Sequence, residues 1–140
     1  MVKKTRNSGT MTESQFFNWI KYKIREMSMY WKPGNEYLKS VRQPRSSVPE
    51  DALSPYFSTE KGLKDRSRFL YKCEHCNLWF RRKDVEKDHI VPTGHVHSFE
   101  DIGRVFERMF IEVDGGWQCL CTSCHVVKSK SERGVYKNDQ

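Results

Sequence analysis

The sequence has no apolar run near the roughly 18 residues that cross a bilayer, and no apolar signal segment follows its first residues. We therefore expect no membrane partner and a cytoplasmic location. Apolar residues are scarce overall, at 36% of 140 residues, while charged residues make up 31%. A hydrophobic core this small would be stabilised by a structural metal, because metal binding contributes directly to the free energy of folding.

Cysteine is also infrequent, with five residues in the chain. Disulfides are rare in a reducing cytoplasm, and the spacing of four of the five cysteines favours a metal instead. Cys73 and Cys76 form one C-x-x-C pair, and Cys121 and Cys124 form another. Two such pairs predict a closed tetrahedral site for a structural Zn²⁺. The alternative is four unrelated buried cysteines.

The fifth cysteine, Cys119, could compete with Cys121 for one ligand position of this site. We favour Cys121, since it completes a C-x-x-C pair with Cys124. Cys119 is then expected to be a buried packing thiol on a short strand, as free cysteines commonly are.

Charge is distributed unevenly along the chain. The net charge is +7; residues 1–70 carry 14 Lys or Arg against 7 Asp or Glu, whereas residues 71–140 carry 11 of each. The whole excess therefore lies in the half without cysteines. It indicates either a polyanionic partner bound in a salt-dependent way or a surface kept soluble by its charge.

Hydrophobic periodicity predicts several helices and a few short strands. A helix is expected from Thr12, capped by Thr12 and Gln15, to Pro33-Gly34, which should end it. Its buried face is expected to carry Phe16, Phe17, Ile20, Ile24, Met27 and Trp31. Further helices are predicted over 35–43, 99–110 and 123–132, and a strand over 85–91. Residues 1–11 are expected to be disordered without a partner.

The predicted strand contains the dipeptide Asp88-His89, and His125 directly follows Cys124. Hydrolysis of a phosphodiester needs an activated water and a cation that neutralises the developing charge. A histidine suits the first task because its pKa lies near neutrality, and an aspartate oxygen suits a hard divalent ion. A zinc bound by Cys124 would fix the position of His125, which could then be a second ligand of that divalent ion.

Three motifs together resemble the HNH endonuclease family, in its zinc-containing branch with four cysteine ligands. They are Cys73-x-x-Cys76, Asp88-His89-Ile90-Val91-Pro92 and Leu120-Cys121-x-x-Cys124-His125-x-x-Lys128. The spacing through residues 98–110 is similar to that of small bacteriophage HNH endonucleases, some of them homing enzymes. The resemblance covers residues 70–132 and, less closely, 12–45. It implies an α+β chain with a ββα-metal (HNH) nuclease core around the zinc site, preceded by an α-helical N-terminal arm.

The resemblance implies a metal-dependent DNA endonuclease that hydrolyses phosphodiester bonds, by nicking or by cutting both strands. It assigns His89 as general base, Asp88 and His125 as ligands of a catalytic Mg²⁺ or Mn²⁺, and Lys128 as a contact to the phosphate. The products would carry 5′-phosphate and 3′-hydroxyl ends. One position departs from the family: the Asn that helps to orient the base falls on Gly116.

The resemblance and the charge distribution suggest four segments: a basic helical DNA-binding region (1–45), a Pro/Ser-rich linker (46–67), the HNH nuclease domain (68–133) and a flexible tail (134–140). We expect a monomer or weak homodimer, located in the host cytoplasm if a phage encodes it. The residues expected to contact DNA are Lys21, Arg25, Lys32, Lys39, Arg42, Arg45, Arg81, Arg82 and Lys83.

Two other functions remain open from the sequence. One is a zinc-stabilised DNA-binding protein with a degenerate HNH site, for which Gly116 is a sign. The other is a toxin nuclease that applies the same chemistry to RNA.

Overall fold

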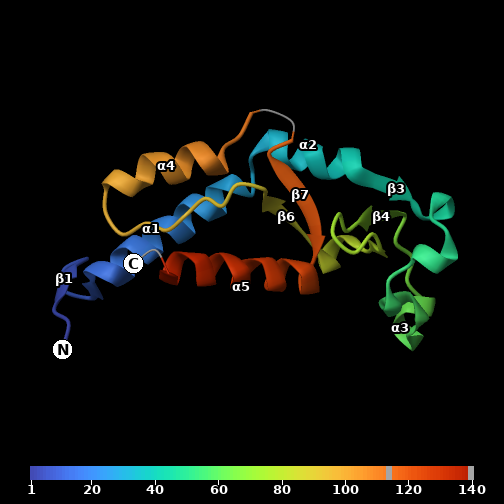
Figure 1. Cartoon of the computed structure of the whole chain (residues 1–140), viewed down its shortest axis with the longest axis horizontal. Helices are drawn as coiled ribbons and strands as arrows, with labels where there is room; N and C mark the ends of the chain where they lie inside the picture. The colour runs from blue at the N-terminus through green and yellow to red at the C-terminus, as the bar shows by residue number, and fades with distance from the viewer. Residues whose placement is uncertain (113–114, 139–140) are drawn as a thin grey trace. The chain divides into compact units, whose positions relative to one another are not determined.

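The computed structural model describes residues 1–112 and 115–138, with side chains up to Glu132. Helices and strands are mixed, as expected for an α+β chain (Figure 1). The chain divides into two compact units: the first combines Met1–Asn35 with Val91–Gly116, and the second combines Glu36–Ile90 with the chain from Trp117 onward. No helix in the described ranges is both long enough and apolar enough to cross a membrane.

The first unit consists of a short hairpin and two helices. The hairpin pairs β1 (Lys4–Arg6) with β2 (Met11–Thr12), and the helices are α1 (Glu13–Ser28) and α4 (Glu100–Met109). Their shared core is formed by Phe17, Ile24, Val96, Val105 and Met109. Met27, which we expected on the buried face of α1, is 50% exposed.

The start of α1 is as the sequence predicts, but its end is not. The Thr12 side chain accepts a hydrogen bond from the Gln15 backbone N–H, and the Gln15 side chain accepts one from the Thr12 N–H, which is a complete capping box. The helix ends at Ser28, and Pro33 lies in the first turn of the next helix, α2 (Lys32–Val41). Proline begins α2 here rather than ending α1, because its missing N–H has no partner to lose in a first turn.

Residues 4–12 form a hairpin, which corrects the expectation that residues 1–11 are disordered without a partner. The hairpin turns through Asn7, Ser8 and Gly9, all with positive φ. The guanidinium of Arg6 lies 4.9 Å from the ring centroid of Phe16 and 5.3 Å from that of Phe99. These cation–π contacts anchor the hairpin to the first unit, and sequence periodicity gives no signal for them.

The second unit contains two small antiparallel sheets and most of the irregular structure. One sheet has the order β3 (Arg42–Pro44), β4 (Phe69–Lys72), β5 (Trp79–Phe80), and the other pairs β6 (Val85–His89) with β7 (Trp117–Cys121). Helix α5 (Thr122–Asn138) follows β7 directly. Leu38, Tyr71, Val85 and Cys119 form a buried core, and Tyr37 and Val41 of α2 pack against it.

The segment 46–67, expected as a linker, is folded in short pieces. It contains the 3-10 helices η2 (Glu50–Ala52) and η3 (Pro55–Ser58) and the single-turn helix α3 (Glu60–Leu63), with η1 (Arg45–Ser47) before them. The Ser54 N–H donates to the Trp79 carbonyl at 2.9 Å, and Phe57 is buried under the Arg45 guanidinium. The segment therefore packs against the rest of the second unit.

The part of the second unit that carries the motifs has a strand–strand–helix order. Strand β6 ends at His89, not at the predicted Val91, and η4 (Arg82–Asp84) precedes it. Helix α5 continues past the predicted end at Glu132 to Asn138, so the expected tail is helical up to that residue; residues 139–140 lie outside the described part of the chain. β6 and β7 thus form an antiparallel pair, and α5 follows β7 directly.

A glycine pair tests whether segment 46–67 is packed. A Cβ on Gly62 would lie 1.9 Å from the Tyr56 carbonyl oxygen, whereas a Cβ on Gly103, in α4, would meet open space. We predict that Gly62→Ala destabilises the second unit by ~1–3 kcal/mol through overpacking, measured by native-state hydrogen exchange.

Gly103→Ala is the matched control, since it places the same methyl group inside a helix. It should stabilise the first unit by ~1 kcal/mol, as alanine favours helix over glycine. A Gly62→Ala protein with unchanged protection would contradict the packing of this segment.

Candidate functional site

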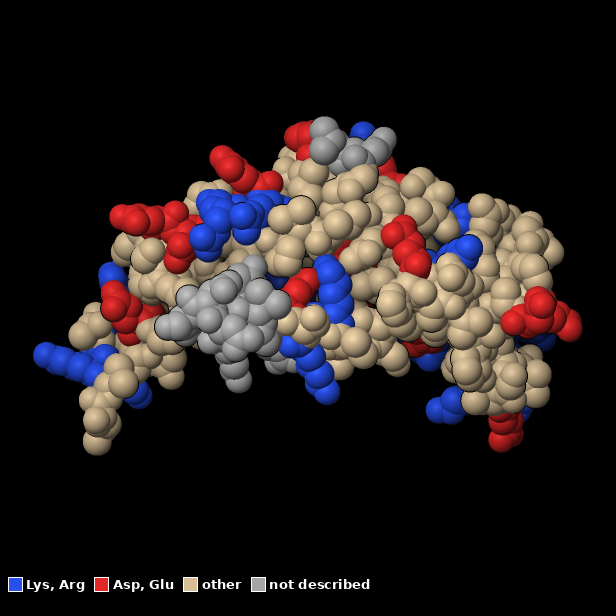
Figure 2. Space-filling model, in the orientation of Figure 1, with Lys and Arg blue, Asp and Glu red and all other residues tan. Residues whose placement is uncertain are grey.

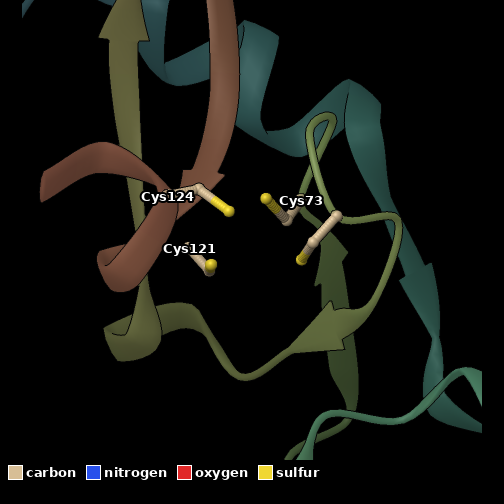
Figure 3. A group of neighbouring side chains, drawn as sticks. Cys73, Cys121 and Cys124 are labelled. Carbon is tan, nitrogen blue, oxygen red and sulfur yellow. The ribbon is translucent and has the colours of Figure 1, made fainter. Parts of the chain in front are cut away.

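Four cysteines converge in the second unit from two distant parts of the chain. Cys73 and Cys76 lie on the turn between β4 and β5, while Cys121 ends β7 and Cys124 lies in the first turn of α5. Their four sulfur atoms lie within 4.8 Å of one another, and Figure 3 shows the labelled side chains of Cys73, Cys121 and Cys124 pointing into one space. The group could bind a metal such as zinc, which prefers a tetrahedron of thiolates.

Backbone hydrogen bonds shape the turn that presents the first pair. The Cys73 N–H donates to the Leu78 carbonyl and the Asn77 N–H donates back to the Cys73 carbonyl, both at 2.9 Å. Asn77 has a φ of 64°, a left-handed conformation that asparagine tolerates better than most residues. The Glu74 N–H donates to the Cys119 carbonyl at 2.9 Å, which ties this turn to β7.

The thiols of this group differ in acidity. Burial acts to raise the pKa of Cys73, but backbone N–H groups of Cys76, Cys121 and His75 outweigh burial and lower it to about 7. Burial raises the pKa of Cys76, and burial together with hydrogen bonds to Cys121 and Cys73 raises that of Cys124. A bound cation would stabilise the thiolate forms of these cysteines, because metal ligands are deprotonated.

Cys119 lies outside this ring, as predicted. Its side chain is fully buried in the core with Leu38, Tyr71 and Val85. Burial raises its pKa to about 12, so it stays a neutral thiol. Of the two cysteines that could have completed the site, the fold selects Cys121.

A second polar cluster lies where β6, β7 and α5 meet, and Asp88 is at its centre. One carboxylate oxygen, Oδ1, lies 3.4 Å from Nε2 of His125. The other, Oδ2, accepts hydrogen bonds from the Gln118 amide at 2.9 Å and from the Lys128 ammonium. The Asp88 side chain is 13% exposed, so these contacts form largely out of water.

The strand and the helix bring these residues together by their periodicities. Glu86 and Asp88 are two residues apart on β6 and share the face towards α5, where Glu86 lies 2.8 Å from Nδ1 of His125. His125 and Lys128 are three residues apart on α5 and share one helix face. Asp88 pairs in register with Gln118 across the β6–β7 ladder.

Lys128, like Asp88, has three polar partners in the cluster. Besides Asp88, its ammonium contacts the His89 carbonyl oxygen at 2.8 Å and the Glu132 carboxylate at 2.9 Å. Burial opposes its charged form, but the hydrogen bonds to Asp88 and Glu132 outweigh burial and raise its pKa. Lys128 is therefore a fixed positive charge on α5.

The imidazole of His89 lies on the other side of the strand from this cluster. Its ring centroid is 6.4 Å from that of Trp117, its partner in the ladder. Lys87 lies 5.8 Å from the Trp117 ring, and burial lowers its pKa. The structure thus joins Asp88, His125 and Lys128 directly, and joins His89 to them through its backbone carbonyl.

Sequence reasoning missed Glu86, Gln118 and Glu132. Glu86 had a usable signal, since it lies two residues before Asp88 on a predicted strand. Glu132 also had one, being four residues after Lys128 on a predicted helix. Gln118 had none, because only the pairing register places it opposite Asp88.

The basic residues expected to contact DNA fall into two groups. Arg25, Lys32, Lys39, Arg82 and Lys83 are exposed, whereas Lys21, Arg42, Arg45 and Arg81 are partly buried. The Arg42 guanidinium lies over Phe69, that of Arg45 donates to the Asp65 carbonyl, and that of Arg81 binds Asp84. On the face shown in Figure 2, basic and acidic side chains are interspersed.

Gly116 packs closely against the side chain of Ile111. A Cβ at this position would lie 2.7 Å from Cδ1 of Ile111. An asparagine at position 116 would therefore require the Ile111 side chain to move. A glycine at position 116 thus fits the local packing without such a movement.

A pair of cysteine substitutions tests the metal site. Cys73→Ala should abolish the thiolate-to-metal absorption seen on titration with Co²⁺, and chelation of the metal should unfold the second unit of the unsubstituted protein. Cys119→Ala is the matched control, since it removes a buried cysteine outside the ring. It should keep the absorption while destabilising the core by ~1 kcal/mol. Equal loss in both variants would contradict the assigned ring.

Comparison with known proteins gives no match: no protein-family model, no curated protein and no solved structure matches this chain.

Proposed function

We propose that the protein is a metal-dependent DNA endonuclease of the HNH type, with zinc in the four-cysteine ring. The observation that carries this proposal is the approach of Asp88 Oδ1 to His125 Nε2 at 3.4 Å, within a ββα arrangement. A carboxylate oxygen and an imidazole nitrogen facing one another are suitable donors for a hard divalent ion.

The proposed zinc has a structural role. It would link the turn at Cys73 to the start of α5 at Cys124, and His125 is the next residue along the helix. Four thiolates leave no open position on zinc, so the chemistry belongs to the neighbouring cluster.

Asp88 and His125 would hold the Mg²⁺ or Mn²⁺ of the reaction. When bound, such an ion neutralises charge that develops on the phosphate and on the leaving oxygen. The hydrogen bonds from Gln118 and Lys128 to Asp88 Oδ2 hold the carboxylate in place and leave Oδ1 towards His125. Lys128 would supply a positive charge for the substrate phosphate.

His89 would act as the general base. An imidazole can take a proton from water near neutral pH, with a contribution of about 10²–10⁴-fold to the rate. Its backbone is fixed by the ladder partner Trp117 and by the Lys128 ammonium on its carbonyl oxygen. Because the ring lies on the face away from Asp88, the water would have to approach from the Trp117 side.

A zinc-stabilised DNA-binding protein with a degenerate HNH site is the second candidate. The observation that favours it is the Lys128 ammonium on Asp88, since a positive charge there competes with a divalent ion. The nicking experiment below separates the two candidates.

We predict that the zinc-loaded protein nicks supercoiled plasmid DNA with Mg²⁺ or Mn²⁺, and that His89→Ala lowers the nicking rate at least about 100-fold. Asp88→Asn and His125→Ala should lower it by weakening the binding of the divalent ion. His75→Ala, an exposed histidine between two cysteines of the ring, is the control and should keep full activity.

Two outcomes would decide against parts of this proposal. Full metal-dependent cleavage by pure His89→Ala protein would remove His89 from the role of base. DNA binding without any cleavage by the unsubstituted protein would favour the non-catalytic candidate.

Exposed basic residues of the N-terminal region provide a test of DNA binding. Neutralising Arg25, Lys32 and Lys39 to glutamine should reduce the slope of log affinity against log salt concentration by about 0.9 for each phosphate that is no longer neutralised. Lys61→Gln with Lys64→Gln, two exposed lysines of α3 and its C-cap, is the control and should leave the slope unchanged. An unchanged slope in the triple variant would exclude this region as the DNA-binding surface.

A further inference from the structure

We propose that the N-terminal hairpin, β1 with β2, is a DNA-binding ribbon that enters the major groove of the duplex. Lys3 and Lys4 would contact phosphates along the groove, and the turn at Asn7 and Ser8 would contact the base edges. The inference rests on DNA as the substrate of the proposed function, and it names an element that recognises this DNA.

The charge of the hairpin segment is of one sign. Residues 1–12 carry Lys3, Lys4 and Arg6 but no Asp or Glu. The charge of Arg6 is used within the fold, since its guanidinium lies 3.3 Å from the carboxylate of Glu13. Lys3 and Lys4 are both exposed, so their positive charge faces solvent. A surface of this kind attracts the phosphate backbone, and each phosphate that it neutralises releases counterions.

The turn of the hairpin is polar and is closed by its own backbone. The Thr10 N–H donates to the carbonyl oxygens of Arg6 and Asn7, both at 3.2 Å, and the Thr10 hydroxyl donates to the Asn7 carbonyl oxygen at 2.8 Å. These bonds use the main chain of Asn7 and not its side-chain amide. Asn7 and Ser8 are exposed, and amide and hydroxyl groups are among those that hydrogen-bond to base edges in the major groove.

The dimensions of the hairpin suit the major groove. A strand rises about 3.3 Å per residue, so the 3 residues of β1 extend about 10 Å, and neighbouring strands lie about 4.8 Å apart. The major groove of B-DNA is about 12 Å wide and about 8.5 Å deep, which admits a two-stranded ribbon. The minor groove, about 6 Å wide, is too narrow for such a ribbon unless the duplex is deformed.

Contacts at the base of the hairpin fix it before any DNA binds. The Arg6 guanidinium lies over the rings of Phe16, Phe17 and Phe99, at 4.9, 5.9 and 5.3 Å from their centroids. Thr12, the last residue of β2, also caps α1. A ribbon held in this way loses little conformational freedom when it binds, which favours affinity.

The first test measures binding of the full-length, zinc-loaded protein to a short fluorescent DNA duplex without added Mg²⁺ or Mn²⁺, so that no cleavage interferes. Lys3→Gln with Lys4→Gln should lower the slope of log affinity against log salt concentration by about 0.9 for each phosphate contact that is lost. Lys61→Gln with Lys64→Gln, the same charge change in α3 and its C-cap, is the control and should leave the slope unchanged. An unchanged slope in the Lys3 and Lys4 variant would overturn the inference.

A second variant tests whether the turn enters the groove. Asn7→Asp keeps the size of the side chain and its tolerance of a positive φ, but it places a carboxylate at the turn. It should weaken duplex binding at least about 10-fold, because a negative charge inside the groove lies close to the phosphates of both strands. Asn18→Asp, the same charge change at an exposed position of α1, is the control and should have a much smaller effect. Equal losses in the two variants would contradict insertion of the turn.

Modified duplexes test the choice of groove. Methylation of guanine N7, which faces the major groove, should weaken binding of the unsubstituted protein and should weaken binding of the Asn7→Asp protein less. Unchanged binding to the methylated duplex would overturn the inference, as would the absence of any binding to duplex DNA. Equal affinity for duplex RNA would also overturn it, since the major groove of RNA is too narrow to be read by side chains.

Failure of the proposed nuclease gives a different pattern. If the hairpin variants weaken binding but the unsubstituted protein cuts no DNA, the role of the hairpin holds and the catalytic proposal fails. If DNA is cut and the hairpin variants bind and cut it like the unsubstituted protein, the reverse is true.

Discussion

The register of the β6–β7 ladder is the constraint on which the candidate site depends. Pairing of Asp88 with Gln118 and of His89 with Trp117 decides which side chains share a face. A slip of one residue would turn Asp88 away from α5 and move the whole cluster apart.

The four cysteines and the cluster around Asp88, both in the second unit, differ in their electrostatics. Backbone N–H groups lower the pKa of Cys73, whereas burial raises the pKa of Cys76 and of Cys124. In the Asp88 cluster, the two carboxylate oxygens have different partners. Oδ2 accepts hydrogen bonds from Gln118 and Lys128, and Oδ1 faces His125. A structural ion and a catalytic ion would thus bind to neighbouring parts of the same helix without competing for ligands.

The first unit shows how local rules and long-range packing combine. The capping box at Thr12 follows from two residues three positions apart, and the structure contains it as predicted. The hairpin before it depends on Arg6 reaching aromatic rings of α1 and of the chain around Phe99, which are far apart in sequence. A proline such as Pro33 can either end a helix or occupy the first turn of the next one. Here Pro33 lies in the first turn of α2, and α2 packs into the core through Leu38.

The C-x-x-C spacings of the sequence predicted the cysteine ring and the choice of Cys121 over Cys119, and residue chemistry suggested Asp88 and His125 as candidates. The ββα order and the candidate Lys128 came only from the resemblance to HNH endonucleases. Only the tertiary structure decided that segment 46–67 is packed, that His89 lies beside Trp117, and that Gln118 lies opposite Asp88. These depend on strand register and on contacts between residues tens of positions apart, for which a single sequence carries no local signal.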